Sequence, residues 1–265
     1  MGTQLTIQEM IDRILAATPY DPAQDTVDTV KTGDPRQHVT GIVTTFLPSY
    51  AVIERAVAIG ANLIIAHEPT FYNHRDETDW LEHDAVYQAK RRLIEEHSLV
   101  IWRFHDYWHQ HRPDGIILGE LKALGWEGFA DADEPWFCSL PPITLEDLVT
   151  YLKDKLGIAG VRVVGQPGMI CRRAALLVGA IGGRMHISVL GRDDIDVAIC
   201  GEINEWDTGE YVRDAIRLGH NKALIVVGHA PSEEAGMDWL AEWLRARVAG
   251  VPIAHIPAGN ALRFA

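Results

Sequence analysis

The chain has 265 residues, which is enough for one large domain or two modest ones, and its 47% hydrophobic and 23% charged residues are typical of a soluble globular protein. A formal net charge of −13 argues that no nucleic acid is the main partner, because phosphate binding needs a basic face. No apolar run reaches the ~20 residues of a membrane helix, so no membrane is expected, and the N-terminal stretch lacks the features of a signal peptide. Three widely spaced cysteines indicate reduced thiols and a cytoplasmic protein.

Helices and short apolar strands alternate along the chain, which is the pattern of an α/β fold. In the first half, the spacing of apolar residues predicts helices over 6–17, 49–59, 80–96 and 116–124, and strands over 39–46, 63–66 and 99–104. In the second half it predicts helices over 144–156, 185–190, 203–218 and 237–249, and strands over 161–164, 171–181, 196–200, the apolar run before His229, and 251–256. The acidic, aromatic and proline-containing segment 126–142 is the best candidate for a linker.

The strand at 63–66 ends in His67-Glu68-Pro69, and the proline stops the strand at that point. An apolar run this short and rich in β-branched residues is typical of a buried parallel strand. In open α/β folds, ligands and metals bind beyond the carboxyl ends of such strands. An imidazole beside a carboxylate there suits a divalent transition metal, although the pair could also simply line a turn.

A second segment repeats this pattern near the end of the chain. Residues 56–69 and 215–233 both contain a helix end, a glycine stop, an asparagine, an apolar strand, a histidine and a proline. Unless two ordinary buried strands match by coincidence, this indicates two related βα halves, each with a histidine at a strand end. His229 precedes Glu233 by four residues, so a helix beginning there would place both side chains on one face.

The strand at 99–104 is followed by His105-Asp106-Tyr107-Trp108-His109-Gln110-His111, in which three of seven residues are histidines. His105 and His109 are four residues apart, so one helical turn would stack them. Asp106 could bind a metal or orient a histidine ligand. The alternative is a solvated histidine-rich loop.

The predicted strand ends supply enough imidazoles and carboxylates for two metals, since a single metal needs about four to six ligands including water. The candidates are His67, Glu68, His105, Asp106, His109, Glu202, His229 and Glu233. Two ions ~3.5–4 Å apart would make hydroxide near neutral pH and hold a developing oxyanion. The sequence carries neither the G-x-S-x-G motif of serine hydrolases nor the glycine-rich motifs of nucleotide-binding loops.

These motifs resemble the dinuclear-metal-centre family, whose members are often labelled GTP cyclohydrolase I type 2-like or NGG-interacting-factor-like proteins. The resemblance covers most of the chain, and its motifs are His67-Glu68-Pro69, the histidine-rich strand end before Pro113-Asp114-Gly115, Cys200-Gly201-Glu202-Ile203, and above all Gly228-His229-Ala230-Pro231-Ser232-Glu233. In that family the first motif is usually His-His-Pro and the second His-x-x-x-Asp. Here Glu68 replaces a histidine and His109 replaces an aspartate, which suggests a swap of ligand types within one coordination sphere.

The resemblance implies two related α/β halves packed around a dinuclear metal site, without the inserted middle domain that the family often carries. We expect residues 1–130 with 220–265 to form the metal-binding α/β domain, and 131–219 to form a second α/β domain. Members of the family commonly form a ring-shaped hexamer, so we also expect a homo-oligomer.

We therefore predict a cytoplasmic hydrolase of a small-molecule substrate that uses two divalent metal ions, Zn, Mn or Fe. The predicted metal ligands are His67, Glu68, His109, His229 and Glu233. The side chains of His105, Asp106 and Glu202 would orient water or substrate, one of them as general base. The competing hypotheses are a non-catalytic oligomer that binds a metal or metabolite through the same ligands, and a scaffold with a vestigial histidine cluster.

Overall fold

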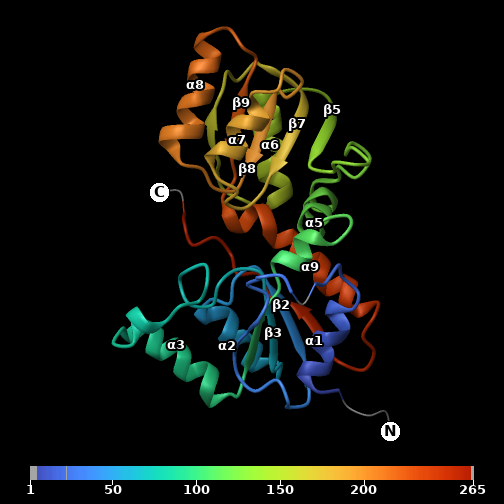
Figure 1. Cartoon of the computed structure of the whole chain (residues 1–265). Helices are drawn as coiled ribbons and strands as arrows, with labels where there is room; N and C mark the ends of the chain where they lie inside the picture. The colour runs from blue at the N-terminus through green and yellow to red at the C-terminus, as the bar shows by residue number, and fades with distance from the viewer. Residues whose placement is uncertain (1–4, 22, 264–265) are drawn as a thin grey trace. The chain divides into compact units, whose positions relative to one another are not determined.

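Two five-stranded sheets organise the residues that the computed structural model describes, 5–21 and 23–263 (Figure 1). The chain divides into two compact units. The first unit spans Met1–Ile116 with Gly236–Ala258, and the second spans Ile117–Ala235 with Gly259–Ala265. This arrangement confirms the predicted α/β class. Among the described residues, no helix has the length and apolar character needed to cross a membrane.

The sheet of the first unit is parallel except for one edge strand. Its order is β1 (Val30–Thr32), β4 (Val100–Arg103), β3 (Leu63–Ala66), β2 (Ile42–Thr45) and β10 (Ile253–His255), with β1 antiparallel to β4. Every residue of β2, β3 and β4 is buried, which explains why their sequences do not alternate between apolar and polar residues. Ala66 pairs with Arg103 at the carboxyl end of the sheet, so the residues after β3 and β4 leave the same edge.

Helices cover both faces of the first sheet. Helices α2 (Tyr50–Ala58) and α3 (Ala85–Glu96) pack on the face that carries Val43, Ile64 and Ile101. Helix α1 (Ile7–Leu15) lies on the opposite side in Figure 1, and begins with a capping box formed by Thr6 and Glu9. The short helices η1 (Asp79–Leu81) and α4 (Asp106–Gln110) follow the strand ends of β3 and β4.

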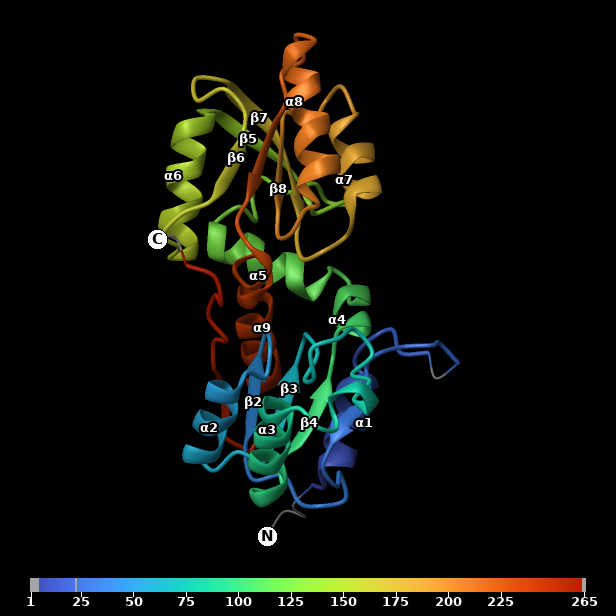
Figure 2. The same cartoon turned by 90° about the vertical axis from the view of Figure 1, so that its left-hand side faces the viewer.

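The sheet of the second unit has a parallel centre between two antiparallel edges. Its order is β5 (Phe137–Thr144), β7 (Ile170–Leu177), β8 (Val197–Cys200), β9 (Ala223–Val226) and β6 (Arg162–Val164). Helices α7 (Gly183–Leu190) and α8 (Glu210–Arg217) contribute to one apolar core on this sheet, and α6 (Leu145–Leu156) lies on its other side (Figure 2). Helix α5 (Gly115–Leu124) precedes this sheet in the chain.

Besides the unpredicted edge strand β1, three segments differ from the elements that the sequence predicts. The segment 126–142 is not a linker, because its second half forms edge strand β5, where exposed Pro141 and Pro142 need no partner for a missing N–H. The predicted helix over 203–218 begins as a π-helical turn, η2 (Glu205–Gly209). Helix α9 (His229–Arg245) begins eight residues before the predicted Met237, with residues 229–235 in the second unit and 236–245 in the first.

Candidate metal centre

The parallel strands β3 and β4 bring the first group of predicted ligands to one sheet edge. His67 follows β3 directly, is buried, and donates its backbone N–H to the carbonyl of Thr45 at 3.2 Å. Glu68 donates its backbone N–H to the carbonyl of Phe46 at 2.7 Å. These bonds continue the pairing with β2 past the last residue of β3, up to the proline, and fix the main chain of both residues.

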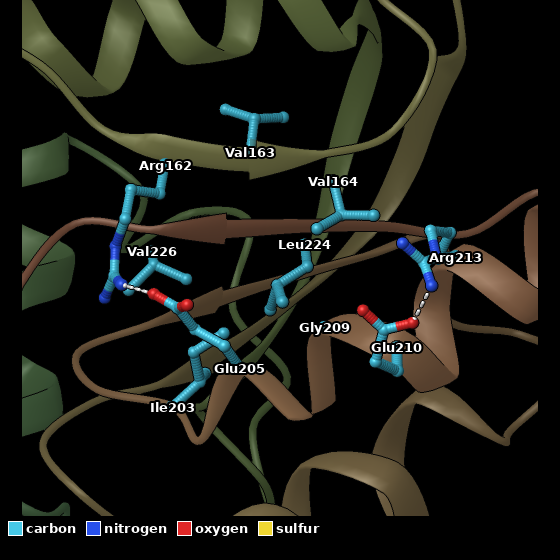
Figure 3. A pocket seen from close by; sticks show the side chains of 10 residues that line it. All are labelled: Arg162, Val163, Val164, Ile203, Glu205, Gly209, Glu210, Arg213, Leu224 and Val226. Carbon is cyan, nitrogen blue, oxygen red and sulfur yellow. Dashed lines mark hydrogen bonds and ion pairs between the residues drawn. The ribbon is translucent and has the colours of Figure 1, made fainter. Parts of the chain in front are cut away.

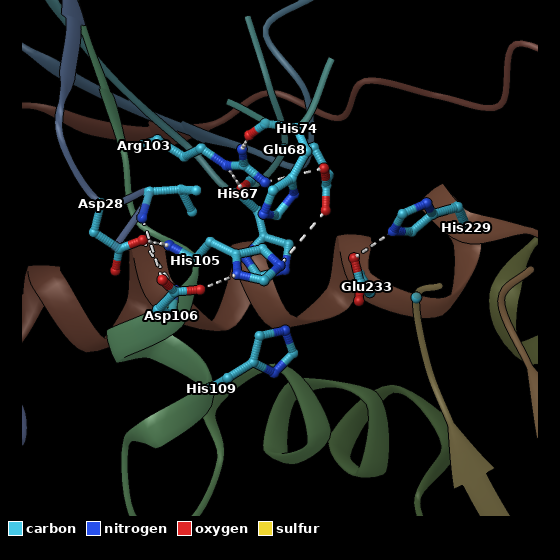
Figure 4. Close-up of polar contacts among 12 residues, drawn as sticks. Asp28, His67, Glu68, His74, Arg103, His105, Asp106, His109, His229 and Glu233 are labelled. Atoms are coloured by element: carbon cyan, nitrogen blue, oxygen red, sulfur yellow. Dashed lines mark hydrogen bonds and ion pairs between the residues drawn. The ribbon is translucent and has the colours of Figure 1, made fainter. Parts of the chain in front are cut away.

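Three histidine rings meet at this edge, as Figure 4 shows. The ring centroids of His67 and His105 lie 4.4 Å apart in a stacked arrangement, and the ring of His109 lies 4.9 Å from each. One ring nitrogen from each histidine lies within 4.8 Å of the other two. Imidazole nitrogens gathered in this way are suitable ligands for Zn, Fe or Mn, with carboxylates completing the set. We call these three residues the histidine cluster.

Two carboxylates orient the rings of the histidine cluster. Asp106 contacts Nδ1 of His105 at 2.8 Å, and Asp114 contacts Nδ1 of His109 at 2.9 Å. Asp106 is itself held through its second oxygen by the hydroxyl of Thr26 and the backbone N–H of Val27. Metal-binding histidines usually have one nitrogen on a carboxylate or carbonyl, which fixes the ring and its tautomer. The donor set and its supports therefore fit a divalent transition metal.

The electrostatics of the histidine cluster favour the forms that bind a cation. Burial holds the pKa of His67 well below its usual range, and the neighbouring His105 and His109 lower it further, so the imidazole is neutral. The hydrogen bond with His105 lowers the pKa of Asp106 far below its ordinary value, which keeps that carboxylate ionised. A neutral imidazole is the state that ligates a metal.

The backbone of α4 is held by a buried acid that the sequence motifs do not mark. The carboxylate of Asp28 accepts the N–H groups of His105, Asp106 and Tyr107, at 2.7, 2.9 and 2.9 Å. Burial raises the pKa of Asp28 against these three hydrogen bonds, which lower it. Because α4 has only five residues, its geometry depends on such contacts and not on helix propensity.

The loop after Glu68 is anchored by a buried lysine on α3. The ammonium of Lys90 donates to the carbonyl of Thr70 at 2.6 Å and lies 5.2 Å from the ring centroid of Tyr72. Burial lowers the pKa of Lys90 to about 8. In the unfolded chain the lysine keeps its ordinary, higher pKa, so between pH 8 and 10.5 the unfolded state binds more protons than the folded state.

We expect the Lys90→Met variant to differ from the unmodified protein in how its free energy of unfolding depends on pH, because it lacks the lysine whose pKa is lowered by burial. Between about pH 8 and 10.5, the free energy of unfolding of the unmodified protein should rise relative to that of the variant, by up to ~1.4 kcal/mol per pH unit. Below pH 8 the difference between the two should be constant. Urea titrations at stepped pH measure it, with exposed Lys155→Met as the control. Parallel pH profiles for Lys90→Met and the unmodified protein would contradict the assignment.

The second unit carries the other predicted ligands at the end of β9. Helix α9 begins at His229, so His229 and Glu233 lie one turn apart, with Nε2 of His229 3.1 Å from Oε2 of Glu233. Nδ1 of the same ring lies 3.1 Å from Oε1 of Glu202, which follows β8. The imidazole of His229 thus lies between the carboxylates of Glu202 and Glu233. The dashed line in Figure 4 marks its contact with Glu233.

The backbone of Gly179 lies close to the pair of His229 and Glu233, and Glu120 is a second buried acid near it. Gly179 has φ +66°, and a Cβ atom there would overlap Oε1 of Glu233. The hydroxyl of Ser232 accepts the N–H of Gly179 at 3.0 Å and donates to the carbonyl of His229 at 2.7 Å. Burial raises the pKa of Glu120 well above its ordinary value, and the charge of Glu233 raises it further, so Glu120 is a neutral acid.

A separate pocket in the second unit lies between β6, β9 and α8 (Figure 3). Its volume is about 260 Å³, and its apolar lining includes Val164, Leu224 and Val226. At its rim, Arg162 pairs with Glu205 at 2.6 Å and Arg213 pairs with Glu210. Each arginine at the rim is therefore balanced by a carboxylate.

The structure therefore groups the predicted residues in two sets, one in each unit. In the first unit, His105 lies in the histidine cluster together with His67 and His109, whereas Asp106 lies behind His105 and contacts its Nδ1. In the second unit, Glu202 and Glu233 flank His229. Sequence reasoning missed Asp28, Arg103 and Asp114, which contact the predicted site residues, and the buried acid Glu120 near Glu233. Only Asp114 carried a signal, the Pro-Asp-Gly turn after the histidines.

The fold and this site define a class: an α/β protein with a strand-end cluster of histidines and carboxylates that could hold a metal. The chain belongs to the Duf34/NIF3 (NGG1p interacting factor 3) family, whose sequence profile matches residues 5–259. This match confirms the resemblance that the sequence motifs indicate.

Known proteins match most of the chain in sequence, and solved structures match nearly all of it in fold. The chain is 24% identical over 209 residues to the GTP cyclohydrolase 1 type 2 homolog of Escherichia coli strain K12, covering 79% of this chain and 81% of that protein. The homolog from Chlamydia muridarum is 25% identical over 230 residues, with 82% and 83% covered. Among solved structures, a Bacillus cereus protein related to NIF3 superposes with a TM-score of 0.78 at 16% identity, covering 100% of this chain and 99% of that one. Staphylococcus aureus protein SA1388 gives 0.76 at 18% identity, with 98% of both chains covered.

Proposed function

We propose that this protein is a hydrolase of a small-molecule substrate that depends on two divalent metal ions. The observation that carries the proposal is the histidine cluster, in which the rings of His105 and His109 are each fixed by a carboxylate. His67, His105 and His109, with Glu68, would ligate one ion, and His229 with Glu233 would supply ligands to the second. The names of the curated homologues refer to GTP cyclohydrolase, but nothing in the site selects GTP.

We propose different roles for the three residues expected to orient water or substrate, His105, Asp106 and Glu202, because their contacts differ. His105 has its ring in the histidine cluster, so we propose it as a ligand. Both oxygens of Asp106 already have partners, so it would hold His105 in place and not take up a proton. The side chain of Glu202 is 59% exposed and contacts His229, so we propose it as the general base that accepts a proton from the attacking water.

The bound ions would supply hydroxide near neutral pH and positive charge for a developing oxyanion. The chain's own residues would orient the ligand rings and keep them in the form that binds a metal. Asp106 and Asp114 keep the two rings in the tautomer that directs a lone pair toward the cluster, and the buried His67 stays neutral. Three buried cysteines support a reducing, cytoplasmic setting, and the family resemblance supports a homohexamer.

The direct test is elemental analysis of protein purified without added metal, followed by a screen of phosphoesters, amides and cyclic amidines with and without chelator. We expect about two ions per chain and chelator-sensitive turnover of one substrate class. Less than one ion per chain would reject the proposal. Two bound ions without turnover of any class would favour the alternative, a metal- or metabolite-binding oligomer.

The histidine cluster can be tested with a matched pair of variants, one within α4 and one at the residue directly after it. We expect His109→Ala to remove the ion bound in the first unit, lowering the affinity by at least about tenfold, because one of its ring ligands is lost. His111→Ala is the control, since the Nδ1 atom of His111 contacts the carbonyl of Pro113 at 2.8 Å and its ring packs on Trp108. Calorimetric titration with Mn²⁺ or Zn²⁺ measures both. Equal loss in the two variants would mean that helix disruption, and not a missing ligand, is responsible.

A further inference from the structure

A buried arginine joins the backbone of the histidine cluster to the carboxylate beside it. Arg103 ends β4, and its side chain is 1% exposed. Its guanidinium donates from Nε to the carbonyl of His67 at 3.0 Å, from Nη2 to Oε2 of Glu68 at 3.3 Å, and from Nη1 to the carbonyl of His74 (Figure 4). A buried cation is costly unless its donors are satisfied, and here all three nitrogens have partners.

The arginine gives the two oxygens of Glu68 different surroundings. Oε2 is held by the guanidinium, whereas Oε1 lies on the side of the histidine cluster, 3.7 Å from Nε2 of His105. The backbone of Glu68 is fixed by its bond to Phe46, so the side chain is restrained at both ends. A planar guanidinium with donors at fixed angles can hold two carbonyls and one carboxylate oxygen at once, which a lysine ammonium on a flexible stem does not reproduce.

We propose that Arg103 is a positioning residue that presents Oε1 of Glu68 to an ion held by His67, His105 and His109. This inference rests on the proposed function. Glu68 would then add one carboxylate oxygen to the three imidazoles of the histidine cluster. Arg103 acts through Glu68 and takes no direct part in the chemistry.

A simpler role for Arg103 would be to fasten the loop after β3, since two of its three acceptors are backbone carbonyls. The two roles predict different couplings between Arg103 and Glu68. If Arg103 works through the carboxylate, its removal should matter only while Glu68 is present. If it fastens the loop, its removal should have the same effect in either background.

The test is a double-mutant cycle read out by Co²⁺ binding to the full-length, metal-free protein, using the visible absorption of the bound ion. We expect Arg103→Met and Glu68→Gln each to weaken Co²⁺ binding about tenfold or more and to change the spectrum in the same way. The double variant should bind no more weakly than Glu68→Gln alone. Arg75→Met is the control, because Arg75 lies on the same loop and forms only an exposed ion pair with Asp25.

The Co²⁺ measurements distinguish failure of the positioning role from failure of the proposed function. If the unmodified protein binds Co²⁺ but Arg103→Met leaves the affinity within twofold, or weakens it equally with and without Glu68, the positioning role is overturned and the proposed function stands. If the unmodified protein holds less than one ion per chain, the proposed function fails and this inference fails with it. If Arg103→Met does not fold, Arg103→Lys replaces it in the cycle. The positioning role then requires that Glu68→Gln weakens Co²⁺ binding and that Arg103→Lys has no further effect once Glu68 is replaced.

Discussion

Replacing Asp28 by alanine is expected to abolish ion binding at the histidine cluster although every ligand remains. The carboxylate accepts three consecutive backbone N–H groups at the start of α4, and the first of them belongs to His105. Without the Asp28 carboxylate, these three N–H groups lose their acceptor in a largely buried environment. The cost is about 1–3 kcal/mol for each N–H group that water does not reach. We expect a total loss of about 3 kcal/mol in the free energy of unfolding and a displaced His105.

The control for this prediction is Asp84→Ala. Asp84 also caps a helix of the first unit, accepting the N–H of Tyr87 at 2.8 Å, but it is exposed and α3 carries none of the predicted ligands. A surface cap of this kind is worth about 1 kcal/mol. Urea denaturation and Zn²⁺ titration of both variants provide the measurement. Full Zn²⁺ affinity in Asp28→Ala would show that α4 keeps its geometry without the cap.

The parts of the fold that local sequence determines could be predicted well. The runs 63–66 and 99–104 read as strands because their apolar residues have no polar face, and both are buried strands in the structure. The helix predicted over 6–17 forms as α1, because its apolar spacing and the capping box of Thr6 and Glu9 both lie within a few residues of sequence. The prolines of 126–142 were misread as linker residues, because sequence alone does not reveal that a strand lies at a sheet edge.

The sequence indicated the histidines that the structure brings together, but not the residues that hold them in place. His67, His105 and His109 stand out because imidazoles at strand ends have few structural explanations. Asp28 supports α4 from 77 positions earlier in the chain, and Arg103 reaches back 35 positions to Glu68. Such contacts depend on tertiary structure, and a single sequence carries no sign that one aspartate among many will be the one buried under a short helix.

Replacing Gly179 by alanine should remove the ion at His229 and Glu233 while costing little stability. Gly179 adopts φ +66°, and the new methyl group would occupy the position of Oε1 of Glu233. The carboxylate is the end of a flexible side chain, so it can move aside, but it then leaves its contact with Nε2 of His229. We expect the strained φ to cost about 1 kcal/mol and the bound ions to fall from two to one per chain.

Gly157→Ala separates these two effects, because Gly157 has nearly the same φ, +64°, with no atom near the added methyl group. Both variants should lose about the same free energy of unfolding, since each places alanine in the left-handed region. Only Gly179→Ala should lose an ion, measured by elemental analysis after dialysis against Mn²⁺ or Zn²⁺. Two ions retained in Gly179→Ala would mean that Glu233 tolerates displacement, and its proposed part as a ligand would then have to be given up.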